Sequence, residues 1–321
     1  MNISTIYKSI NEDLIKVNDA LKSITTVDFP WLSELLDYSL KSSGKKIRPV
    51  LTLLSGKFYN YNFDRLRPMA TAVEIMHTAT LVHDDAIDKS IVRRGIPTVN
   101  KLWGEGKAIL LGDYLFAEAG SLTADTNNLR VVKLFTKTLR TLSSGELNQS
   151  FNAFNLEQTN EQYLQRISNK TASLFSMATE SGALLSEAPE EATQHLKEYG
   201  HNLGIAFQIV DDILDFIGTE EEMGKPVGSD LAQGTLTLPA MILLKHHPDD
   251  NPVKRLFHNE NKQDNIRQAI ELVRSSSIIK DCYTVASDYC TRAHQCLSLL
   301  PDGDNRRALA KLADFVVSRK R

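Results

Sequence analysis

The sequence predicts an all-α fold. Through most of the chain, apolar residues recur at steps of three and four positions, and strict alternation over the length of a strand is almost absent. Only 16 glycines and 10 prolines interrupt 321 residues, which favours long regular elements with few tight turns. A content of 42% hydrophobic and 24% charged residues indicates a globular chain with a large core, and it excludes the disordered and fibrous classes.

Two long helices are predicted, and each ends in a group of aspartates. The first covers residues 66–88, and the second covers residues 196–218, where a glycine marks the end. Glycine-containing stretches at 95–106 and 218–234 follow the two acidic groups and interrupt the helices. The polar segment 246–265, with its two prolines, is expected to be a surface connection before the C-terminal helices.

The chain is expected to form a single domain over residues 1–321, because no interdomain linker is visible. The apolar stretch near residues 239–244 is far shorter than the about 18 to 20 residues that a membrane span needs, so no transmembrane segment is expected. No basic region followed by an apolar one opens the chain, which favours a cytoplasmic protein. A formal net charge of −3 gives no global field that would attract nucleic acid, so any anion binding must come from local clusters.

Familiar templates for metal, phosphate and nucleotide binding are absent or fail. Cys282, Cys290 and Cys296 match no zinc spacing, so buried free thiols are expected. The segment 218–225 departs from a Walker A loop in its spacing and in the proline that follows it, and no glycine pattern completes a dinucleotide fingerprint.

The strongest functional signal is an acidic pattern that occurs twice, as Asp-Asp-Ala-Ile-Asp at residues 84–88 and as Asp-Asp-Ile-Leu-Asp at residues 211–215. On a helix, the first and last aspartates of each copy are four positions apart, so their carboxylates are expected to be neighbours on one face. Like charges repel there, and the negative end of the helix dipole disfavours them further, so something cationic must offset them. The alternative is a solvated acidic helix end, but the helices that lead into both copies are too apolar for that.

Carboxylate-only clusters suit hard cations, and Mg²⁺ in particular keeps water ligands and is commonly shared with substrate phosphates. Two clusters facing each other would clamp a diphosphate through bridging Mg²⁺ ions. Basic residues then gain a role as ligands for a second, metal-free diphosphate, although a basic pair is usually a solvated surface feature. The candidates are Lys45, Lys46, Arg48, Arg93, Arg94, Lys170 and Lys225.

The order of these motifs resembles that of the trans-prenyltransferases, the polyprenyl diphosphate synthases. The matching segments are Gly-Lys-Lys-Ile-Arg-Pro at 44–49, His-Asp-Asp-Ala-Ile-Asp at 83–88, Arg-Arg-Gly at 93–95, Gly-Asp-Tyr-Leu at 112–115, Lys-Thr at 170–171, Gln208 with the aspartates of 211–215, and Gly-Lys at 224–225. The resemblance implies an isoprenoid-synthase helical bundle around a central cavity, usually a homodimer. It also implies the condensation of isopentenyl diphosphate with an allylic diphosphate such as farnesyl diphosphate.

Roles are carried over from the family only at matching positions. The expected Mg²⁺ ligands are Asp84, Asp88 and Asp211, which form the catalytic group together with Lys170. The pocket for isopentenyl diphosphate corresponds to Lys45, Arg48, His77 and Arg94. The groups around the allylic diphosphate correspond to Arg93, Lys170, Thr171, Gln208 and Lys225. His77 lies two helical turns before Asp84, so one helix face can present both, whereas the alternative is a core histidine with one satisfied nitrogen.

The implied chemistry is ionisation of an allylic carbon–oxygen bond, with the metal and the basic groups stabilising the diphosphate as charge develops on it. The double bond of isopentenyl diphosphate then attacks the carbocation, and the departing diphosphate accepts a proton, so no side-chain base is required. Uncharged groups such as Thr171 and Gln208 would stabilise the cation without trapping it.

Thr235 departs from the pattern of the family, because many members have lysine at this position. The missing positive charge is expected to weaken the binding of the allylic diphosphate without inactivating the chain.

Product length is expected to depend on residues below the first acidic motif, because the growing apolar tail must run beside this helix. Ala79 and Thr80 are small and lie about 6 to 8 Å below Asp84 along the axis, whereas short-chain members of the family tend to carry aromatics there. With Met76 or the deeper Phe116 as a floor, we expect roughly seven to ten isoprene units and an octaprenyl product as the central value, for instance for quinone side chains. The alternative interpretation is that the small side chain of Ala79 only permits close packing between helices.

Two other functions remain open from the sequence. A terpene cyclase or head-to-head condensing enzyme on the same fold generally has serine or threonine where Asp215 stands, and it has no use for a second diphosphate pocket at Lys45 and Arg48. A non-catalytic subunit of a heteromeric synthase usually lacks one acidic motif, and both are intact here. The basic residues 319–321 are expected to be a solvated tail rather than a lid over a diphosphate.

Overall fold

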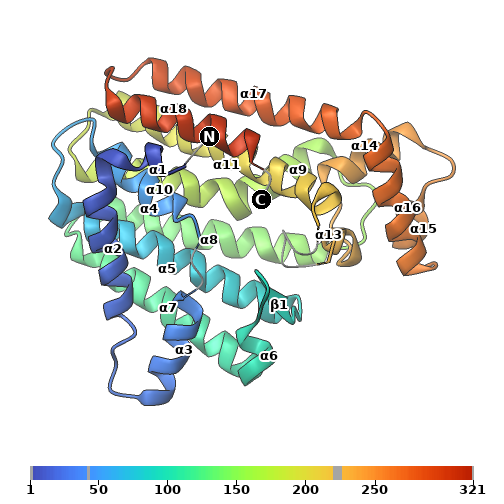
Figure 1. Ribbon diagram of the computed structural model, residues 1–321, viewed down its shortest axis with the longest axis horizontal. Helices are drawn as coiled ribbons and strands as arrows, with labels where there is room; N and C mark the ends of the chain where they lie inside the picture. Colours follow the sequence, from blue (N-terminus) through green and yellow to red (C-terminus); the bar gives the residue numbers. More distant parts are fainter. Residues whose placement is uncertain (1–2, 42–43, 220–225, 320–321) are drawn as a thin grey trace.

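Helices form almost the whole of the structure, which confirms the predicted fold class. The computed structural model describes residues 3–41, 44–219 and 226–319 (Figure 1). Within those ranges the only strands are β1 (Val92–Arg93) and β2 (Ile96–Pro97), which pair antiparallel as a small hairpin.

The long helices follow the longest dimension of the molecule (Figure 1). They are α5 (Phe63–Ile87), α7 (Glu105–Asp125), α8 (Leu129–Phe151), α10 (Ser173–Leu185), α11 (Glu190–Ile217), α17 (Ile278–Ser298) and α18 (Asp304–Ser318). The other helices and helical turns are α1 (Ile3–Ile6), η1 (Lys8–Ile10), α2 (Asn11–Ser23), α3 (Pro30–Leu40), α4 (Ile47–Gly56), α6 (Val99–Trp103), α9 (Asn160–Ile167), the π turn η2 (Ser168–Ala172), α13 (Ser229–Ala232), α14 (Leu238–His246), α15 (Pro252–Phe257) and α16 (Lys262–Ser275). None of the described helices combines the length and the apolar composition required to cross a bilayer.

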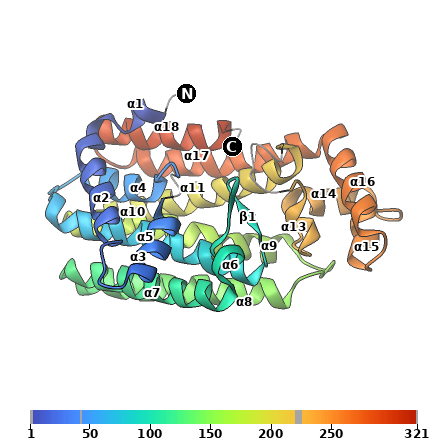
Figure 2. The same ribbon diagram turned by 60° about the horizontal axis from the view of Figure 1, so that its bottom comes forward.

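The long helices are stacked in layers. α17 and α18 lie side by side along one face, and α11 packs beneath them against α17 and α10 (Figure 1). α10 packs on α4, α4 packs on α5, and α5 packs along its length on α7. α7 and α8 form the opposite face (Figure 2). The acidic ends of α5 and α11 therefore lie inside the bundle, between the two outer layers.

Both predicted helices begin earlier than the apolar pattern indicates, and a side-chain cap explains this for α5. The side chain of Asn62 accepts a hydrogen bond from the backbone N–H of Arg65 at 3.3 Å, so α5 begins at Phe63 rather than near residue 66. α11 begins after Pro189, and acidic residues in its first turn favour the positive end of the helix dipole. The two predicted helices are thus confirmed, with a longer N-terminal part in each.

The core consists of two groups of buried side chains that share two helices. α11 places Leu203 in the first group and Ile213 in the second, and α17 places Leu297 in the first and Ile278 in the second. α1 to α8 and α18 contribute to the first group, and α9 and α14 to α16 contribute to the second. Because α11 and α17 run through both groups, the groups are packed on one continuous framework.

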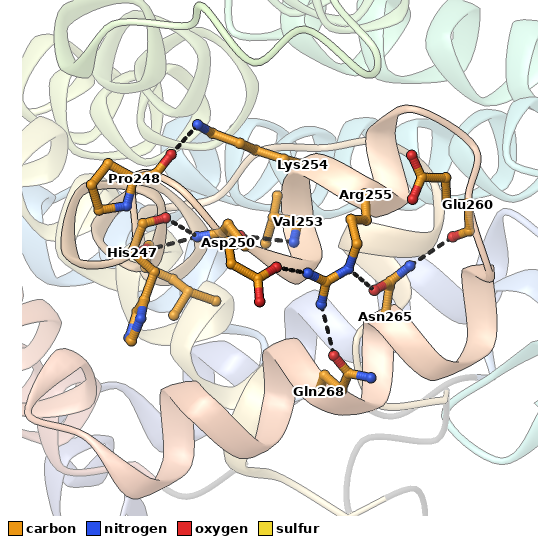
Figure 3. Close-up of polar contacts among 11 residues, drawn as sticks. His247, Pro248, Asp250, Val253, Lys254, Arg255, Glu260, Asn265 and Gln268 are labelled. Atoms are coloured by element: carbon orange, nitrogen blue, oxygen red, sulfur yellow. Dashed lines mark hydrogen bonds and ion pairs between the residues drawn. The ribbon is translucent and has the colours of Figure 1, made fainter.

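The segment 246–265 is more ordered than a simple surface connection. The side chain of Asn251 is buried, donates to the carbonyl of Leu243 at 3.0 Å, and accepts from the N–H of Val253 at 2.8 Å, which starts α15. The guanidinium of Arg255 donates to Asn265 at 3.0 Å and Gln268 at 2.8 Å and pairs with Asp250 (Figure 3). Side-chain hydrogen bonds of this kind explain why a polar, proline-containing stretch forms a helix here.

Candidate functional site

One cavity of about 1620 Å³ collects most of the residues that the sequence singles out. Its lining includes Lys45, Arg48, His77, Thr80, Asp84, Asp88, Arg93, Arg94, Lys170, Thr171, Gln208 and Asp211. Met76 and Ala79 do not line it, and both side chains are packed in the core. Lys225 lies outside the described residues. The cavity is therefore built from elements far apart in the sequence, at the C-terminal ends of α5 and α11.

The first acidic motif forms the last turn of α5 and directs two of its three carboxylates into the cavity. Asp84 and Asp88 line the cavity, whereas Asp85 is buried and accepts a hydrogen bond from Arg93 Nε at 2.7 Å. Burial raises the pKa of Asp88, and the positive charges of Lys170 and Arg93 oppose that shift. The carboxylates of Asp84 and Asp88 are partly removed from water and face an open cavity. A cation bound beside them would therefore stabilise their charged forms.

The second acidic motif is used differently from the first, which corrects the expectation of two equivalent neighbouring carboxylates. Asp211 lines the cavity, but Asp215 is buried beneath α13. Its carboxylate accepts hydrogen bonds from Ser229 Oγ at 2.9 Å and from the backbone N–H of Asp230 at 3.1 Å. The physical reason is that the chain returns over α11 after residue 226 and offers the N–H groups that begin α13.

The middle aspartate of the second motif belongs to a hydrogen-bonded chain. Asp212 is buried and accepts from Tyr163 OH at 2.7 Å and from Gln208 Nε2 at 2.8 Å. Gln208 in turn accepts from Thr171 Oγ1 at 2.6 Å. Burial raises the pKa of Asp212 to about 7. The chain of bonds fixes the orientation of the Gln208 amide and the Thr171 hydroxyl at the cavity wall.

Lys170 and Thr171 enter the cavity from the π turn η2, which lies between α9 and α10. Lys170 Nζ is 2.8 Å from Glu146 Oε2 and 3.8 Å from Asp84 Oδ2. Burial alone would lower the pKa of Lys170, but the carboxylates of Asp84 and Glu146 raise it, so the ammonium stays charged. π turns are rare and occur frequently at functional sites, and nothing in the local sequence pattern predicts this one.

A second cationic region lies at the start of α4 and the β1–β2 hairpin. The Arg48 guanidinium lies 4.9 Å from the ring centre of Phe175, and burial lowers its pKa to about 10. Arg94 lies against Gly44, where a Cβ atom would come within 3.1 Å of a guanidinium nitrogen. Burial, and then the charges of Arg48 and Arg94, hold the pKa of His77 well below its usual value, so the imidazole is neutral. The region therefore presents permanent cations beside a neutral imidazole donor.

Glu74 is a residue of this region that the sequence patterns did not indicate. It lies one helical turn before His77, lines the cavity, and has a fully buried oxygen without a hydrogen-bond partner among the described residues. Burial raises the pKa of Glu74, while the charges of Arg48, Lys46 and Arg94 oppose the shift. The only signal in the sequence was its position one turn before His77 on the same helix face.

The hairpin turn explains how two adjacent arginines reach different groups. Arg94 and Gly95 are the two loop residues between β1 and β2, and both have positive φ angles, 52° and 78°. A two-residue hairpin of this kind requires positive φ at both positions. The turn directs Arg93 to Asp85, whereas Arg94 reaches Gly44.

Arg319 corrects the expectation that the last basic residues form a solvated tail. Its side chain is 6% exposed and lies over the ring of Phe207 at 3.8 Å. The guanidinium donates to the carbonyl of Phe207 at 2.8 Å and to Asp211 Oδ1 at 3.3 Å. The stacking and the ion pair hold this residue in the cavity, whereas residues 320 and 321 lie outside the described part of the chain.

Apolar side chains line another part of the cavity wall. They include Leu81, Phe116, Leu142 and Leu174. Phe116 contacts the ring of His83 edge to face, with 5.4 Å between ring centres. Thr80 lies at the boundary, and its hydroxyl donates to the carbonyl of His77. The cavity thus has both charged and apolar lining, as a ligand with a charged head and an apolar tail requires.

Gly112 and Thr235 belong to predicted motifs and have structural explanations. A Cβ atom at Gly112 would lie 2.1 Å from the His83 ring, so only glycine lets α7 approach α5 beside the first acidic motif. His83 Nε2 is 2.9 Å from the carbonyl of Ile109. Thr235 lines the cavity, and its backbone N–H donates to the carbonyl of Asp230 at 2.8 Å. A threonine there adds no charge to the cavity.

The donor set fits a hard divalent cation. Asp84, Asp88 and Asp211 offer only carboxylate oxygens, and all three line one cavity. Lys170 and Arg319 already lie next to two of them, which shows that the cluster draws positive charge. Oxygen ligands with open space around them are the environment in which Mg²⁺ keeps water or phosphate ligands.

Comparison of the chain with protein families gives one family over most of its length. The family described as polyprenyl synthetase matches residues 29–273. Component 2 of the heptaprenyl diphosphate synthase of Bacillus subtilis is 37% identical over 320 residues, which cover 100% of this chain and 92% of that protein. A prenyl transferase of Synechocystis is 36% identical over 323 residues, and 99% of each chain is covered.

Solved structures with the same architecture cover the chain from end to end. A polyprenyl synthase of Caulobacter crescentus, in complex with calcium and isoprenyl diphosphate, superimposes with a TM-score of 0.95 at 32% identity and covers 100% of this chain and 98% of its own. A decaprenyl diphosphate synthase of Rhodobacter capsulatus has a TM-score of 0.92 at 36% identity, with 100% of both chains covered.

Proposed function

We propose, since this chain belongs to the polyprenyl synthetase family and is a prenyltransferase, that it makes a long-chain polyprenyl diphosphate. The reaction is the repeated head-to-tail addition of isopentenyl diphosphate to an allylic diphosphate such as farnesyl diphosphate. The observation that carries the proposal is a cavity with two separate cationic regions, one beside the acidic motifs and one at Arg48 and Arg94, together with an apolar wall.

The allylic diphosphate is proposed to bind beside the acidic motifs. Mg²⁺ held by Asp84, Asp88 and Asp211 would supply Lewis-acid stabilisation of the leaving diphosphate. Lys170 and Arg93 add fixed positive charge on the same side, and Lys225 is the remaining candidate from the sequence. Thr171 and Gln208, oriented by their mutual hydrogen bond of 2.6 Å, present oxygen dipoles toward the carbon that becomes positive. None of these groups has to accept a proton.

Isopentenyl diphosphate is proposed to bind to Lys45, Arg48, His77 and Arg94. Arginine forks suit bidentate contacts with a diphosphate, and a neutral His77 donates one hydrogen bond without adding charge. Glu74 balances part of the positive charge when no substrate is bound, because it lies among Arg48, Lys46 and Arg94. The neighbouring cations are thereby held together at a lower electrostatic penalty before the anion binds.

The experiment that tests the proposal uses the purified chain with Mg²⁺, farnesyl diphosphate and labelled isopentenyl diphosphate. The dephosphorylated products are then sized by chromatography. We expect a ladder that ends in one long prenyl alcohol and that disappears when a chelator removes Mg²⁺. Incorporation of only one or two units would contradict the long-chain assignment, and no incorporation by the chain alone would contradict an enzyme complete in one polypeptide.

Product length is proposed to be set at Thr80 and the apolar wall, with an octaprenyl product as the central value. Relatives named heptaprenyl and solanesyl diphosphate synthases, and a decaprenyl diphosphate synthase of known structure, support a long product. Met76 and Ala79 were expected to contribute, but they lie in the core, so a bulky residue there would overpack it rather than close a tunnel.

The Thr80→Phe substitution tests this proposal, because it places an aromatic ring at the boundary of the cavity. We expect the product distribution to shorten by several isoprene units with little change in the midpoint of thermal unfolding. The Ala79→Phe variant is the matched comparison, and it should lower that midpoint more than it shortens the product. An unchanged product length in Thr80→Phe would exclude this position as the determinant.

The active unit is proposed to be a homodimer formed by α7 and α8. These neighbouring helices expose large apolar side chains, among them Leu110 at 68% and Phe151 at 87%. Large exposed apolar side chains on neighbouring helices are typical of a protein interface when they form a contiguous patch. The name of the Bacillus subtilis relative, component 2, makes a different partner subunit the second candidate. Light scattering that gives the mass of two chains would support the homodimer, and a monomeric mass would favour the second candidate.

A further inference from the structure

A group of three potential metal ligands lies outside the cavity, between α17 and α18. Cys290 and His294 are four positions apart on α17, so they share one helix face, and Asp314 faces them from α18. One ligand atom from each residue lies within 4.8 Å of the other two. None of the three lines the cavity described above.

The three side chains form a gradient from the core to the solvent. Cys290 is 8% exposed, whereas the side chains of His294 and Asp314 are 38% and 51% exposed. The thiol therefore lies at the bottom of the group, and the two partly exposed side chains lie on its solvent side. His294 Nε2 lies 2.8 Å from Asp314 Oδ1, so the ring nitrogen points into the group.

The chemistry of this donor set differs from that of the acidic motifs. One sulfur, one imidazole nitrogen and one carboxylate oxygen suit a borderline-soft ion such as Zn²⁺, and sites with three protein ligands keep a fourth position for water. Zn²⁺ binds these ligands at about 2.0 to 2.3 Å, so the His294–Asp314 contact of 2.8 Å has to open and both side chains have to turn toward the ion. Both outer side chains are partly exposed.

We propose that Cys290, His294 and Asp314 form a second metal site, selective for Zn²⁺ over Mg²⁺, with water as the fourth ligand. The cysteines match no zinc spacing in the sequence because the third ligand comes from a different helix, 20 residues after His294. Burial, and then the carboxylate of Asp314, raise the pKa of the Cys290 thiol to about 11. Binding of the ion would therefore release a proton from the sulfur.

The consequence of such a site is a clamp between the two C-terminal helices. α18 is followed directly by Arg319, five residues after Asp314, and Arg319 contacts Asp211 in the cavity. An ion held by both helices would fix α18 on α17 and, through it, the position of Arg319. The bound ion would thus stabilise the helical bundle, and it would affect the reaction only through the position of Arg319.

Cobalt titration of the metal-free full-length chain tests the proposal. Co²⁺ bound to a thiolate gives a near-ultraviolet charge-transfer absorption, whereas Co²⁺ on the aspartates of the cavity has no sulfur ligand and gives none. We expect the absorption in the wild type, with saturation at one ion per chain and displacement by Zn²⁺. The Cys290→Ser variant should lose it, and His294→Gln should weaken Zn²⁺ binding by at least about 100-fold, more than the loss of a hydrogen-bond partner of a ligand causes.

The Cys296→Ser variant is the matched control, because Cys296 is equally buried on the same helix. It should retain the absorption. The thermal midpoint measured with chelator should be similar in all variants, and Zn²⁺ should raise it more in the wild type and in Cys296→Ser than in Cys290→Ser and His294→Gln. No thiolate absorption in the wild type, its persistence in Cys290→Ser, or its equal loss in Cys296→Ser would overturn the proposal.

Discussion

The carboxylates of Asp211 and Asp215 lie one helical turn apart but face different surroundings. Asp211 faces the open cavity, and Asp215 anchors the first turn of α13. Asp211→Ala should therefore lower kcat/KM by at least about 100-fold, equivalent to about 3 kcal/mol of transition-state stabilisation, with little effect on unfolding. Asp215→Ala should lower the free energy of unfolding by about 1 to 3 kcal/mol, because it removes the carboxylate that accepts two partly buried hydrogen bonds at the start of α13.

Steady-state kinetics and chemical denaturation of both variants provide the measurements. If Asp215→Ala kept its stability and lost activity as completely as Asp211→Ala, the two carboxylates would have equivalent roles and the structural distinction between them would be wrong.

His77 provides a pH-dependent contribution to stability. Its pKa is held well below 6.5 in the folded chain by burial and by Arg48 and Arg94. Below pH 6.5 the unfolded chain therefore binds a proton that the folded chain does not, so the free energy of unfolding falls as the pH falls through that range. In His77→Gln this decrease should be smaller by up to about 1.4 kcal/mol per pH unit.

Denaturant unfolding at several pH values between about 5 and 7 checks this expectation, because that range spans the pKa of a histidine in an unfolded chain. The same substitution at the exposed His258 controls for the change of side chain. An identical pH slope in the wild type and in His77→Gln would show that His77 takes up its proton over the same pH range in the folded and the unfolded chain, which would contradict a lowered pKa.

At the residue scale, the sequence predicted what the cavity contains better than it predicted each residue's partner. Repetition and spacing identified Asp84, Asp88 and Asp211. They could not show that Asp215 would turn to α13 or that Arg319 would stack on Phe207, because both depend on the chain returning from elsewhere. Glu74 carries no motif of its own, and its role follows only from the three cations folded around it.

The π turn η2 is the element on which the placement of Lys170 and Thr171 depends. Deleting Asn169 should restore the ordinary helical hydrogen-bond pattern and rotate the flanks of the turn by about 100° relative to each other, so Lys170 and Thr171 lose their present alignment with the cavity. We expect far-ultraviolet circular dichroism close to that of the wild type and a loss of at least about 100-fold in kcat/KM.

The matched comparison is Lys170→Ala combined with Thr171→Val, which removes both functional groups but keeps the π turn. The deletion and the double substitution should lose activity to a similar extent. A deletion variant with normal turnover would mean that the π geometry is dispensable.

At the element scale, the sequence predicted the long helices well and the irregular elements poorly. The apolar periodicity of α5 and α11 is a property of each segment alone, so it is visible without tertiary structure. The β1–β2 hairpin and the π turn are too short for any period to develop. The polar network around Arg255, in turn, joins residues from two helices and the loop before them.

The whole molecule is proposed to be one cooperative unit, since α11 and α17 each contribute side chains to both buried groups. If either group lost its packing, α11 and α17 would be exposed, and these helices also belong to the other group. Calorimetry should therefore give one transition whose calorimetric and van't Hoff enthalpies agree for the folding unit. Two separate transitions, or early hydrogen exchange confined to α14 to α16, would divide the chain into two domains.

The all-α architecture was predictable from composition and periodicity, because sparse glycine and proline with a helical period permit few alternatives. The stacking order of the layers was not, since every helix has an apolar face and the sequence does not state which faces meet. The resemblance to a known family supplied the central cavity that periodicity alone could not.

Lys46 and Arg94 keep a backbone conformation that glycine or asparagine adopts more readily, with φ angles of 48° and 52°. Each costs roughly 1 to 2 kcal/mol relative to an ordinary backbone region, and both lie on the cationic wall of the cavity. A library selected only for heat resistance should therefore accumulate asparagine or glycine at these positions. Such survivors would resist heat better and turn over more slowly, which is the trade-off expected where charge placement has been favoured over rigidity.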